Sequence, residues 1–486
     1  MNQIGFKNFR RFKELAPIDL NPLTIFVGEN NAGKSTVVKA LLVVIDFIKT
    51  RVSALENDSW LNMNFYFNKS HYTHLGTFDR ARNNQANEDD PITFTFSFAD
   101  RRYEIDIMKS DSTAGVFGRI YKIKMTLLPL NIDFTFSLTT DRRINVVFHA
   151  TPYPGYNPDE ITQDLKPSTI NRYFKGLTKD IEIEMTINPE LRFTSEYIVD
   201  ALLLSFKTQF FSTLNKLNSK KALNANTDLF LSDEAQQFLL KKRAVFNKNY
   251  FKNNKQADID VEYIYAHAVT QNLIFNASDV KGYHDNAVHD FVNQQIDKGS
   301  ILDTKIENWM HSFRIGLGYN ILSEGGEAHI VRILNFDGKE VNLADKGMGS
   351  IQLMILLFRI ATKISEAGIL FHGKKSNTIL IIEEPEQNLH PMLQSKLADF
   401  FYSLYKEYGF RFIIETHSEY LIRNTQVLVN NGFKSDPDFV NPFKVIYYPS
   451  DDKAPYDMIY REDGKFSNEF GTGFFDEAAN LAFEIF

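Results

Sequence analysis

The hydrophobic residues of this chain follow two different spacings. Residues 92–98 read Ile-Thr-Phe-Thr-Phe-Ser-Phe, a strict alternation that places every second side chain on one face of a strand. Similar short runs follow at 103–107, 120–127, 132–138 and 144–148, separated by turn residues. We predict an antiparallel meander with one buried face in residues 91–150, and a strand pair in residues 1–20.

Three other segments, 23–27, 378–382 and 411–414, are mostly apolar, and the exceptions are Thr24, Thr378 and Arg411. This composition is typical of parallel strands that are covered on both faces of a sheet. Open α/β sheets bind ligands at the carboxyl ends of such strands, and here those ends carry glycine or acidic residues. The pattern predicts an α/β fold with a mixed sheet and, separately, the antiparallel meander.

Residues 153–300 have a different character. After a stretch rich in Pro, Gly and Asp and a short strand at 181–187, helical spacing appears at 197–217, 232–248 and 290–296. No heptad pattern continues for several repeats, so we do not expect a long coiled coil. We predict a mainly helical insertion between two α/β halves.

Composition narrows the possible chemistry. The 486 residues are 43% hydrophobic and 24% charged, the balance of a globular protein of two or three domains. The absence of Cys excludes disulfides, thiolate metal sites and cysteine nucleophiles. The apolar runs 37–48 and 351–360 are too short to span a bilayer, and the N-terminus lacks a secretion signal. We expect a cytoplasmic protein without a membrane partner.

The clearest motif lies between the apolar run 23–27 and a helical run that begins at Ser35. It fits G-x-x-x-x-G-K-[ST], and a strand before it and a helix after it are the context that such a phosphate loop requires. We expect Lys34 to reach the β- and γ-phosphates of ATP and the Ser35 hydroxyl to bind Mg²⁺. A glycine turn without a ligand is the alternative, but the independent flanks argue against it. The nucleotide-binding residues predicted here are Gly28, Asn30, Asn31, Ala32, Gly33, Lys34, Ser35 and Thr36.

Acidic residues and a histidine follow the two later apolar strands. The run 378–382 ends in Glu383 and Glu384, and the run 411–414 leads to His417. We expect Glu383 to hold the Mg²⁺ shell and Glu384 to orient and deprotonate the water that attacks the γ-phosphate. His417 can donate a hydrogen bond to that phosphate. Alternatively, the acids form a charged strand end before a turn, and the histidine is structural.

A second anion-binding helix start is predicted at residues 344–350. Small residues and a hydroxyl precede the helical run 351–364, and the residues concerned are Asp345, Gly347, Gly349 and Ser350. The segment 322–327, Leu-Ser-Glu-Gly-Gly-Glu, looks similar but precedes a strand instead of a helix. We therefore prefer 345–350.

Three polar stretches allow two interpretations each. Residues 7–13 and 241–252 mix cations with aromatic residues, which suits nucleic acid but also suits a solvated strand edge or helix end. Because the net charge is −7, a nucleic-acid surface would have to be a local patch. The His-Asp pairs at 284–285 and 289–290 suggest a metal site, but exposed turns are the interpretation that we favour.

The order of these motifs resembles that of the ABC-type ATPases of the RecF, SMC and OLD class. The segments that match are 8–12, the phosphate loop, 383–391 (Glu-Glu-Pro-Glu-Gln-Asn-Leu-His-Pro) and 415–418 (Glu-Thr-His-Ser). The resemblance implies that 344–350 is a signature loop, which touches the γ-phosphate bound by the opposite subunit. Two chains would then enclose two ATP molecules head to tail, as a dimer or a larger homo-oligomer.

The resemblance also implies a domain order. An ATPase head would comprise 1–150, with the phosphate loop and meander, and 301–425, with the signature loop, the Walker B acids and the histidine switch. The helical insertion would occupy 151–300, and 426–486 would form a small α/β cap with a last helix opening near 471–477.

Two features depart from the class. Its Gln after the first helix has no counterpart in residues 75–79, where Thr77 or Asp79 are the available substitutes. The residues after His417 are too few for the Toprim nuclease domain of OLD proteins. The chain therefore resembles the ATPase subunits of antiphage systems such as PARIS and Septu, whose effector nuclease is a separate protein. A DNA-binding repair or maintenance ATPase is the alternative, and a transporter subunit fits least well.

Overall fold

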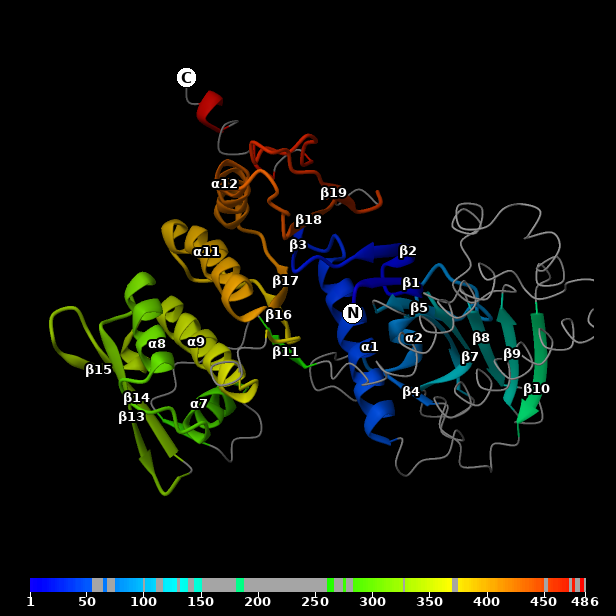
Figure 1. Ribbon diagram of the computed structural model, residues 1–486, viewed down its shortest axis with the longest axis horizontal. Coiled ribbons are helices and arrows are strands. Elements are labelled where there is room, and N and C mark those ends of the chain that lie inside the picture. The colour runs from blue at the N-terminus through cyan, green and yellow to red at the C-terminus, as the bar shows by residue number, and fades with distance from the viewer. Residues whose placement is uncertain are drawn as a thin grey trace, which may run out of the picture. The chain divides into compact units, whose positions relative to one another are not determined.

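The computed structural model describes residues 1–54, 64–67, 75–98, 101–110, 117–128, 132–138, 144–150, 181–187, 260–265, 274–276, 283–326, 328–368, 375–449, 453–471, 474–476 and 481–484 (Figure 1). The Cα packing separates two units that interleave along the sequence. Unit 1 contains residues 1–19 and 39–258, and unit 2 contains 20–38 and 259–486. The predicted helices 197–217 and 232–248 and the basic stretch 241–252 lie outside the described residues. The four consecutive domains expected from the sequence stay a prediction.

Unit 1 contains a nine-stranded antiparallel sheet in the order β10-β9-β8-β7-β6-β5-β1-β2, with β4 paired to β7. The predicted meander and the N-terminal strand pair are confirmed, and the strand at 181–187 extends the meander instead of belonging to a separate insertion. Rings of Phe6, Phe9, Phe65 and Phe94 pack together beneath the sheet. The elements are β1 (Gln3–Phe9), β2 (Phe12–Asp19), β4 (Asn64–Tyr66), α2 (Phe78–Ala81), β5 (Ile92–Ser97), β6 (Arg101–Lys109), β7 (Phe117–Leu127), β8 (Ile132–Leu138), β9 (Ile144–Ala150) and β10 (Ile181–Ile187).

Unit 2 is built on a six-stranded sheet in the order β11-β16-β17-β3-β18-β19. The first five strands are parallel, and β19 pairs antiparallel at the edge. Their bounds are β3 (Leu23–Gly28), β11 (Val261–Ile264), β16 (Ile379–Glu383), β17 (Arg411–Glu415), β18 (Phe443–Tyr448) and β19 (Tyr456–Met458). The three mostly apolar runs are therefore parallel neighbours, as predicted, and Gly28, Glu383 and Glu415 lie at one edge of the sheet.

Helices pack against this sheet and against one another. They are α9 (Met348–Glu366), α11 (Pro391–Tyr408) and α12 (Glu419–Ser435), and α1 (Lys34–Ala54) begins directly after the phosphate loop. In the part of the chain that the structure describes, α9 alone has the length and hydropathy of a membrane span. The run 351–360 is part of this longer helix, so our argument from its length was wrong. Because 72% of its apolar window is buried inside the protein, α9 is a core helix.

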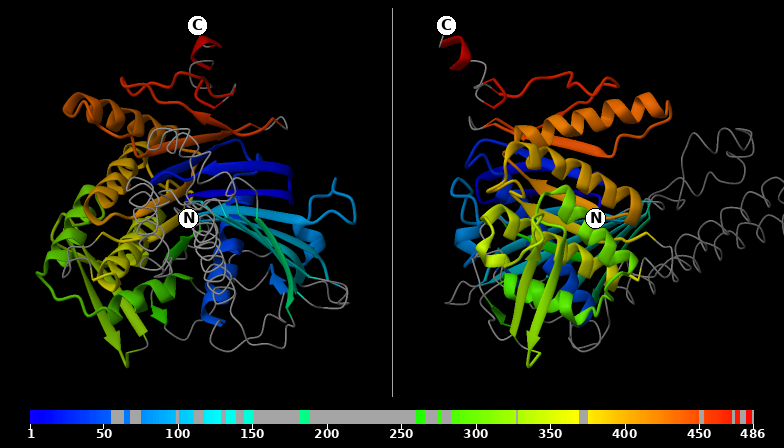
Figure 2. Two further views of the ribbon diagram at one scale, coloured as in Figure 1. Left: turned by 45° about the vertical axis from the view of Figure 1, so that its right-hand side comes forward. Right: turned by 90° about the vertical axis from the view of Figure 1, so that its left-hand side faces the viewer.

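A smaller sheet completes unit 2, with α7 and α8 beside α9 (Figure 2). Its elements are β12 (Phe275–Asn276), α7 (Tyr283–Asn293), α8 (Ile301–Ser312), β13 (Gly318–Glu324), β14 (Ala328–Leu334), β15 (Glu340–Asn342) and the short 3₁₀ helix η3 (Leu343–Asp345). The His-Asp pairs at 284–285 and 289–290 lie within α7, so the exposed turns that we favoured for them are wrong.

The C-terminal segment differs from the expected cap. Strand β18 pairs in parallel with β3, from Phe443 opposite Leu23 to Tyr448 opposite Gly28, and so belongs to the main sheet of unit 2. Residues 474–476 form a bend, and the described helical residues after it are 481–484. The sheet therefore continues on both sides of the phosphate-loop strand.

Candidate active site

The phosphate loop is a tight connection between β3 and α1. Gly28 and Gly33 have φ angles of 140° and 108°, and Asn31 has a φ of 61°, all in the region that favours glycine. A Cβ on Gly28 would clash with the carbonyl oxygen of Tyr448 in the neighbouring strand β18. The position therefore requires glycine for two reasons, its φ angle and the close strand beside it.

Lys34, the lysine of the motif, is 3% exposed. Its Nζ donates to the carbonyl oxygens of Gly28, at 3.0 Å, and Glu29, at 2.8 Å. Burial lowers the pKa of Lys34, and the nearby carboxylates of Glu415 and Glu384 oppose that shift. The side chain of Lys34 thus bends back over its own loop. Its ammonium is hydrogen-bonded to two carbonyl oxygens that phosphate oxygens could replace.

Ser35, the next residue, donates from its Oγ to Oε1 of Glu415 at 2.7 Å. Glu415 is 4% exposed, and burial raises its pKa to about 7 although the bond from Ser35 opposes the shift. Glu415 belongs to the matching segment 415–418, but the sequence suggested no role for it. Strand β17 lies between β3 and β16, which places Glu415 opposite Phe26 on one side and opposite Glu383 on the other.

Glu383, the acid predicted to hold Mg²⁺, lies one strand farther from the phosphate loop. Its carboxylate accepts a hydrogen bond from the hydroxyl of Tyr263 on β11, and burial together with Glu383 raises the pKa of Tyr263. Glu383 and Glu415 are aligned neighbours at the ends of their strands. The structure therefore brings two carboxylates, not one, to this edge of the sheet.

Glu384, the predicted general base, occupies an unusual backbone conformation with a φ of 43°. Its amide donates to the carbonyl of Glu415 at 2.7 Å, and the side-chain amide of Gln387 donates to its Oε2. Nε2 of His417 lies 3.9 Å from its Oε1. A strained residue that neighbours hold in place is typical of catalytic positions.

The backbone of His417 is held by Glu386. This residue belongs to segment 383–391, and the sequence had suggested no role for it. Oε1 of Glu386 accepts from the backbone amide of His417 at 2.7 Å. Glu386 is 7% exposed, and burial raises its pKa. Burial also lowers the pKa of His417, with Lys34 acting in the same direction.

The predicted signature loop runs from η3 into α9. Asp345 and Gly347 are exposed, and Gly347 precedes the helix without a side-chain cap. A Cβ on Gly349 would lie 2.5 Å from the carbonyl oxygen of Asn388, so this glycine allows the start of α9 to approach the segment after Glu384. The amide of Ser350 donates to the carbonyl of Gly347 at 2.9 Å. In the alternative segment 322–327, the described residues 322–326 end β13 and begin the turn toward β14, so they precede a strand, as the sequence indicated.

A family model described as an AAA ATPase domain matches residues 1–422. The chain belongs to this AAA ATPase domain family. It is therefore an ATPase, which binds ATP and converts ATP and water to ADP and phosphate, and the predicted enzyme class is confirmed. No curated protein sequence matches the chain.

The ATPase also has distant likenesses among solved structures. An Smc head domain from Pyrococcus furiosus, with an extended coiled coil and bound to the C-terminal domain of ScpA, is 12% identical over 100% of this chain and 98% of that chain, with a TM-score of 0.35. The SMC head domain from Thermotoga maritima is 9% identical over 92% and 94%, with a TM-score of 0.30. At such low scores neither likeness bears on function.

The remaining residues that the sequence singled out, the possible Gln substitutes and the His-Asp pairs, contact other side chains or backbone groups of the protein. Thr77 caps helix α2 by accepting from the amide of Arg80, and Asp79 pairs with Lys109 at 2.8 Å. In α7, Nδ1 of His289 lies 3.1 Å from Nε2 of the buried His329. Among the described residues, no group of three or more His, Asp or Glu side chains is arranged to hold a metal by itself.

Proposed function

We propose that this ATPase hydrolyses Mg²⁺-bound ATP at the edge where β3, β16 and β17 end. The observation that carries the proposal is the convergence there of the phosphate-loop lysine and serine with Glu384 and His417. The pKa values support the same grouping. The charge of Glu384 acts on the pKa of Lys34, and the charges of both Lys34 and Glu384 act on the pKa of His417. All these residues belong to unit 2.

Lys34 would bind the phosphates by exchanging partners. A buried ammonium needs hydrogen-bond acceptors, and the two loop carbonyls supply them in this structure. Phosphate oxygens are stronger acceptors because they are charged. Binding therefore replaces two neutral contacts with charge-assisted ones and leaves no buried donor unpaired.

The residues present also fit a magnesium ion. Hydroxyl and carboxylate oxygens are the ligands that Mg²⁺ prefers, and Ser35, Glu383 and Glu415 supply them. Oε2 of Glu415 is buried and has no hydrogen-bond partner among the residues that the structure describes, which leaves an oxygen available to a cation. When bound, the ion would neutralise charge that develops on the phosphates.

Glu384 would act as the general base. Its side chain is 27% exposed, so water can reach it, and Gln387 donates to its Oε2. His417 would donate to the γ-phosphate, and Glu386 would hold the backbone of that histidine in place. A base of this kind contributes about 10²- to 10⁴-fold to the rate.

We further propose that the complete site forms between two chains, with the signature loop of one chain against the ATP of the other. The exposed, uncapped start of α9 supports this, because helix N-termini attract phosphates. Lys34→Ala protein and Ser350→Ala protein should each be inactive, but a mixture should recover activity through one intact hybrid site. A mixture that stays inactive would contradict the head-to-tail arrangement.

The assembled ATPase would serve as a sensor or scaffold that holds or releases a separate effector, such as a nuclease, in cytoplasmic antiphage defence. The motif order, with its likeness to the ATPase subunits of such systems, supports this role. The test is ATP turnover per chain at increasing protein concentration, with and without duplex DNA. A rate that rises with concentration and ignores DNA supports a composite site with a protein trigger.

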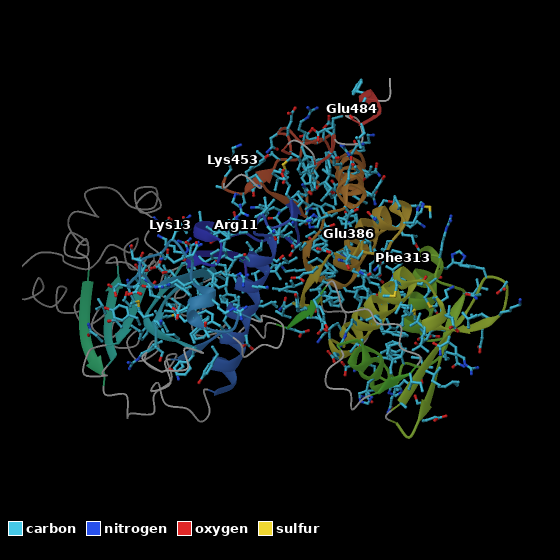
Figure 3. The ribbon with its side chains drawn as sticks, turned by 180° about the vertical axis from the view of Figure 1, so that it is seen from behind. Arg11, Lys13, Phe313, Glu386, Lys453 and Glu484 are labelled. Atoms are coloured by element: carbon cyan, nitrogen blue, oxygen red, sulfur yellow. The ribbon has the colours of Figure 1, made fainter. Side chains whose placement is uncertain are left out.

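A DNA-binding maintenance ATPase is the second candidate, and one observation in unit 1 favours it. The half-buried guanidinium of Arg10 lies close to that of Arg80, and burial together with Arg80 lowers its pKa. Neither guanidinium has a carboxylate partner in the part of the chain that the structure describes. Arg11 and Lys13 follow in the same hairpin (Figure 3). Arg80→Glu should weaken DNA binding and reduce its salt dependence if this surface contacts phosphates.

A further inference from the structure

Glu384, the proposed base, begins a closed turn directly after β16. The amide of Gln387 donates to the carbonyl oxygen of Glu384 at 3.1 Å, which is the hydrogen bond of a β-turn with Pro385 at its second position. Proline favours that position because its fixed φ angle suits the turn. The turn therefore keeps the backbones of Glu384, Glu386 and Gln387 in one arrangement.

Hydrogen bonds to the end of β17 and the residues after it fix this turn in place. The amide of Glu384 donates to the carbonyl oxygen of Glu415 at 2.7 Å. The buried carboxylate of Glu386 accepts from the amide of His417, also at 2.7 Å. The backbones of the base and of the histidine are therefore held relative to each other. These contacts leave the side chain of Glu384 free to rotate, and its carboxylate oxygens are chemically equivalent.

The surroundings of the carboxylate make its oxygens different. The side-chain amide of Gln387 donates to Oε2 of Glu384. Oε1 lies 3.9 Å from Nε2 of His417, which is too long for a hydrogen bond but lets one water oxygen contact both atoms. Because Oε2 is occupied, Oε1 is the oxygen that can take a proton from a water beside His417.

From this arrangement we infer that Gln387 is a positioning residue for the base, because its amide holds Oε2 of Glu384 so that Oε1 faces the attacking water and His417. The inference rests on the proposed function, in which Glu384 activates that water. Gln387 acts through Glu384 and not on the nucleotide. A carboxylate released from this bond turns into orientations in which neither oxygen reaches the water, which lowers the rate of hydrolysis without changing nucleotide affinity.

The first test separates turnover from binding. Gln387→Met has a side chain of nearly the same length and shape but no N–H donor. It should lower the kcat of ATP hydrolysis by about 10- to 100-fold. Its affinity for a fluorescent, non-hydrolysable ATP analogue should stay within about twofold of wild type, because the phosphate loop is unchanged.

A double variant shows whether Gln387 acts through Glu384. In a Glu384→Gln background the base is already lost, so adding Gln387→Met should lower the residual turnover by less than about twofold. A further loss of about tenfold or more would show that Gln387 serves the reaction by another route, and the inference would be wrong.

Gln387→Glu adds a readout that depends on pH and covers the case in which Gln387→Met does not fold. The introduced carboxyl can donate to Glu384 when it is protonated but repels Glu384 when it is ionised. Its turnover relative to wild type at the same pH should therefore fall by about tenfold between pH 6 and pH 8. The matched control is Gln426→Glu on α12, where Gln426 accepts from Arg423 at 3.4 Å, and its ratio to wild type should stay constant.

Other results would also overturn the inference. One is a wild-type kcat in Gln387→Met, and another is an equal loss of kcat and analogue affinity, which indicates a structural role. The last is a turnover ratio for Gln387→Glu that does not change with pH. Failure of the proposed function looks different, because Glu384→Gln itself would then hydrolyse ATP at the wild-type rate.

Discussion

The buried carboxyl of Glu415 should make the stability of the nucleotide-free protein depend on pH. Burial raises its pKa from the ordinary value of 4.5 to about 7. Glu383 and Glu384 add to the shift by repulsion, while the Ser35 hydrogen bond and the Lys34 ammonium oppose it. The substitution that isolates this effect is Glu415→Gln, which is neutral at every pH and can still accept from Ser35.

The sign follows from the direction of the shift. Because the folded protein holds the proton more tightly than the unfolded chain, this stabilisation is fully present below pH 4.5 and is lost as the pH rises through about 7. The difference between the two pKa values corresponds to about 3 kcal/mol. Between pH 5 and pH 8, the wild type should therefore lose about 2 to 3 kcal/mol of unfolding free energy relative to Glu415→Gln.

The assay is urea unfolding of both proteins in EDTA, without nucleotide, at several pH values from 5 to 8. Comparing the two proteins at each pH cancels most of the contribution of His417, whose lowered pKa acts in the opposite direction. Glu419→Gln is the matched control and should show a constant difference from wild type. The reasoning would be refuted if the plots of unfolding free energy against pH for wild type and Glu415→Gln stayed parallel within about 0.5 kcal/mol. The carboxylate would then ionise equally easily in the folded and the unfolded protein.

The remaining predictions concern the nucleotide and the loops. Lys34→Ala should abolish binding or hydrolysis of ATP, measured by calorimetry and phosphate release; normal turnover would contradict its role. Glu384→Gln should keep nucleotide affinity but lower turnover by about 10²- to 10⁴-fold and accumulate an ATP-bound dimer in size-exclusion chromatography; wild-type turnover would disprove the base assignment. Gly349→Ala should lower the unfolding free energy by about 1 to 3 kcal/mol, because its Cβ would press on the Asn388 carbonyl. Gly347→Ala, whose Cβ meets open space, should change stability by less than about 0.5 kcal/mol.

Much of the fold could be predicted because local pattern and sheet position agree. Strict alternation in 92–98 produced a half-buried antiparallel strand, and the mostly apolar run 378–382 produced a central parallel one. Segment 284–290 failed because His, Asp and Asn favour turns locally, whereas Ala287, Val288 and Phe291 form a buried helical face. Tertiary packing overrode the local preference there.

Strand β18 shows a second limit to what the sequence alone can predict. Its residues pair with β3, which precedes them by about 420 positions in the chain, and no local pattern specifies a partner at that distance. The segment was therefore assigned to a separate cap. Once it is placed beside β3, the requirement for glycine at position 28 has a second cause, the carbonyl of Tyr448.

The same limit explains why Glu415 was missed in the candidate site. In the sequence, Glu383, Glu384 and Glu415 are all acids at the ends of apolar strands, and the pair of adjacent glutamates draws attention first. Which acid faces Ser35 depends on the strand order β16-β17-β3, which is a property of the fold. The available signal was that β17, like β16, ends in a glutamate.

The loop contacts have a consequence for how nucleotide and metal should bind. Lys34 can exchange its two carbonyl partners for phosphate oxygens without leaving a buried charge, since the carbonyls can turn to water or to loop amides. Ser35 cannot leave Glu415 so easily, because the buried carboxylate then loses the hydrogen bond that the Ser35 hydroxyl donates to it. A cation that arrives with the nucleotide removes this difficulty. Mg²⁺ should therefore strengthen nucleotide binding more in the wild type than in Glu415→Gln, so that the metal and the nucleotide bind cooperatively because of one buried carboxylate.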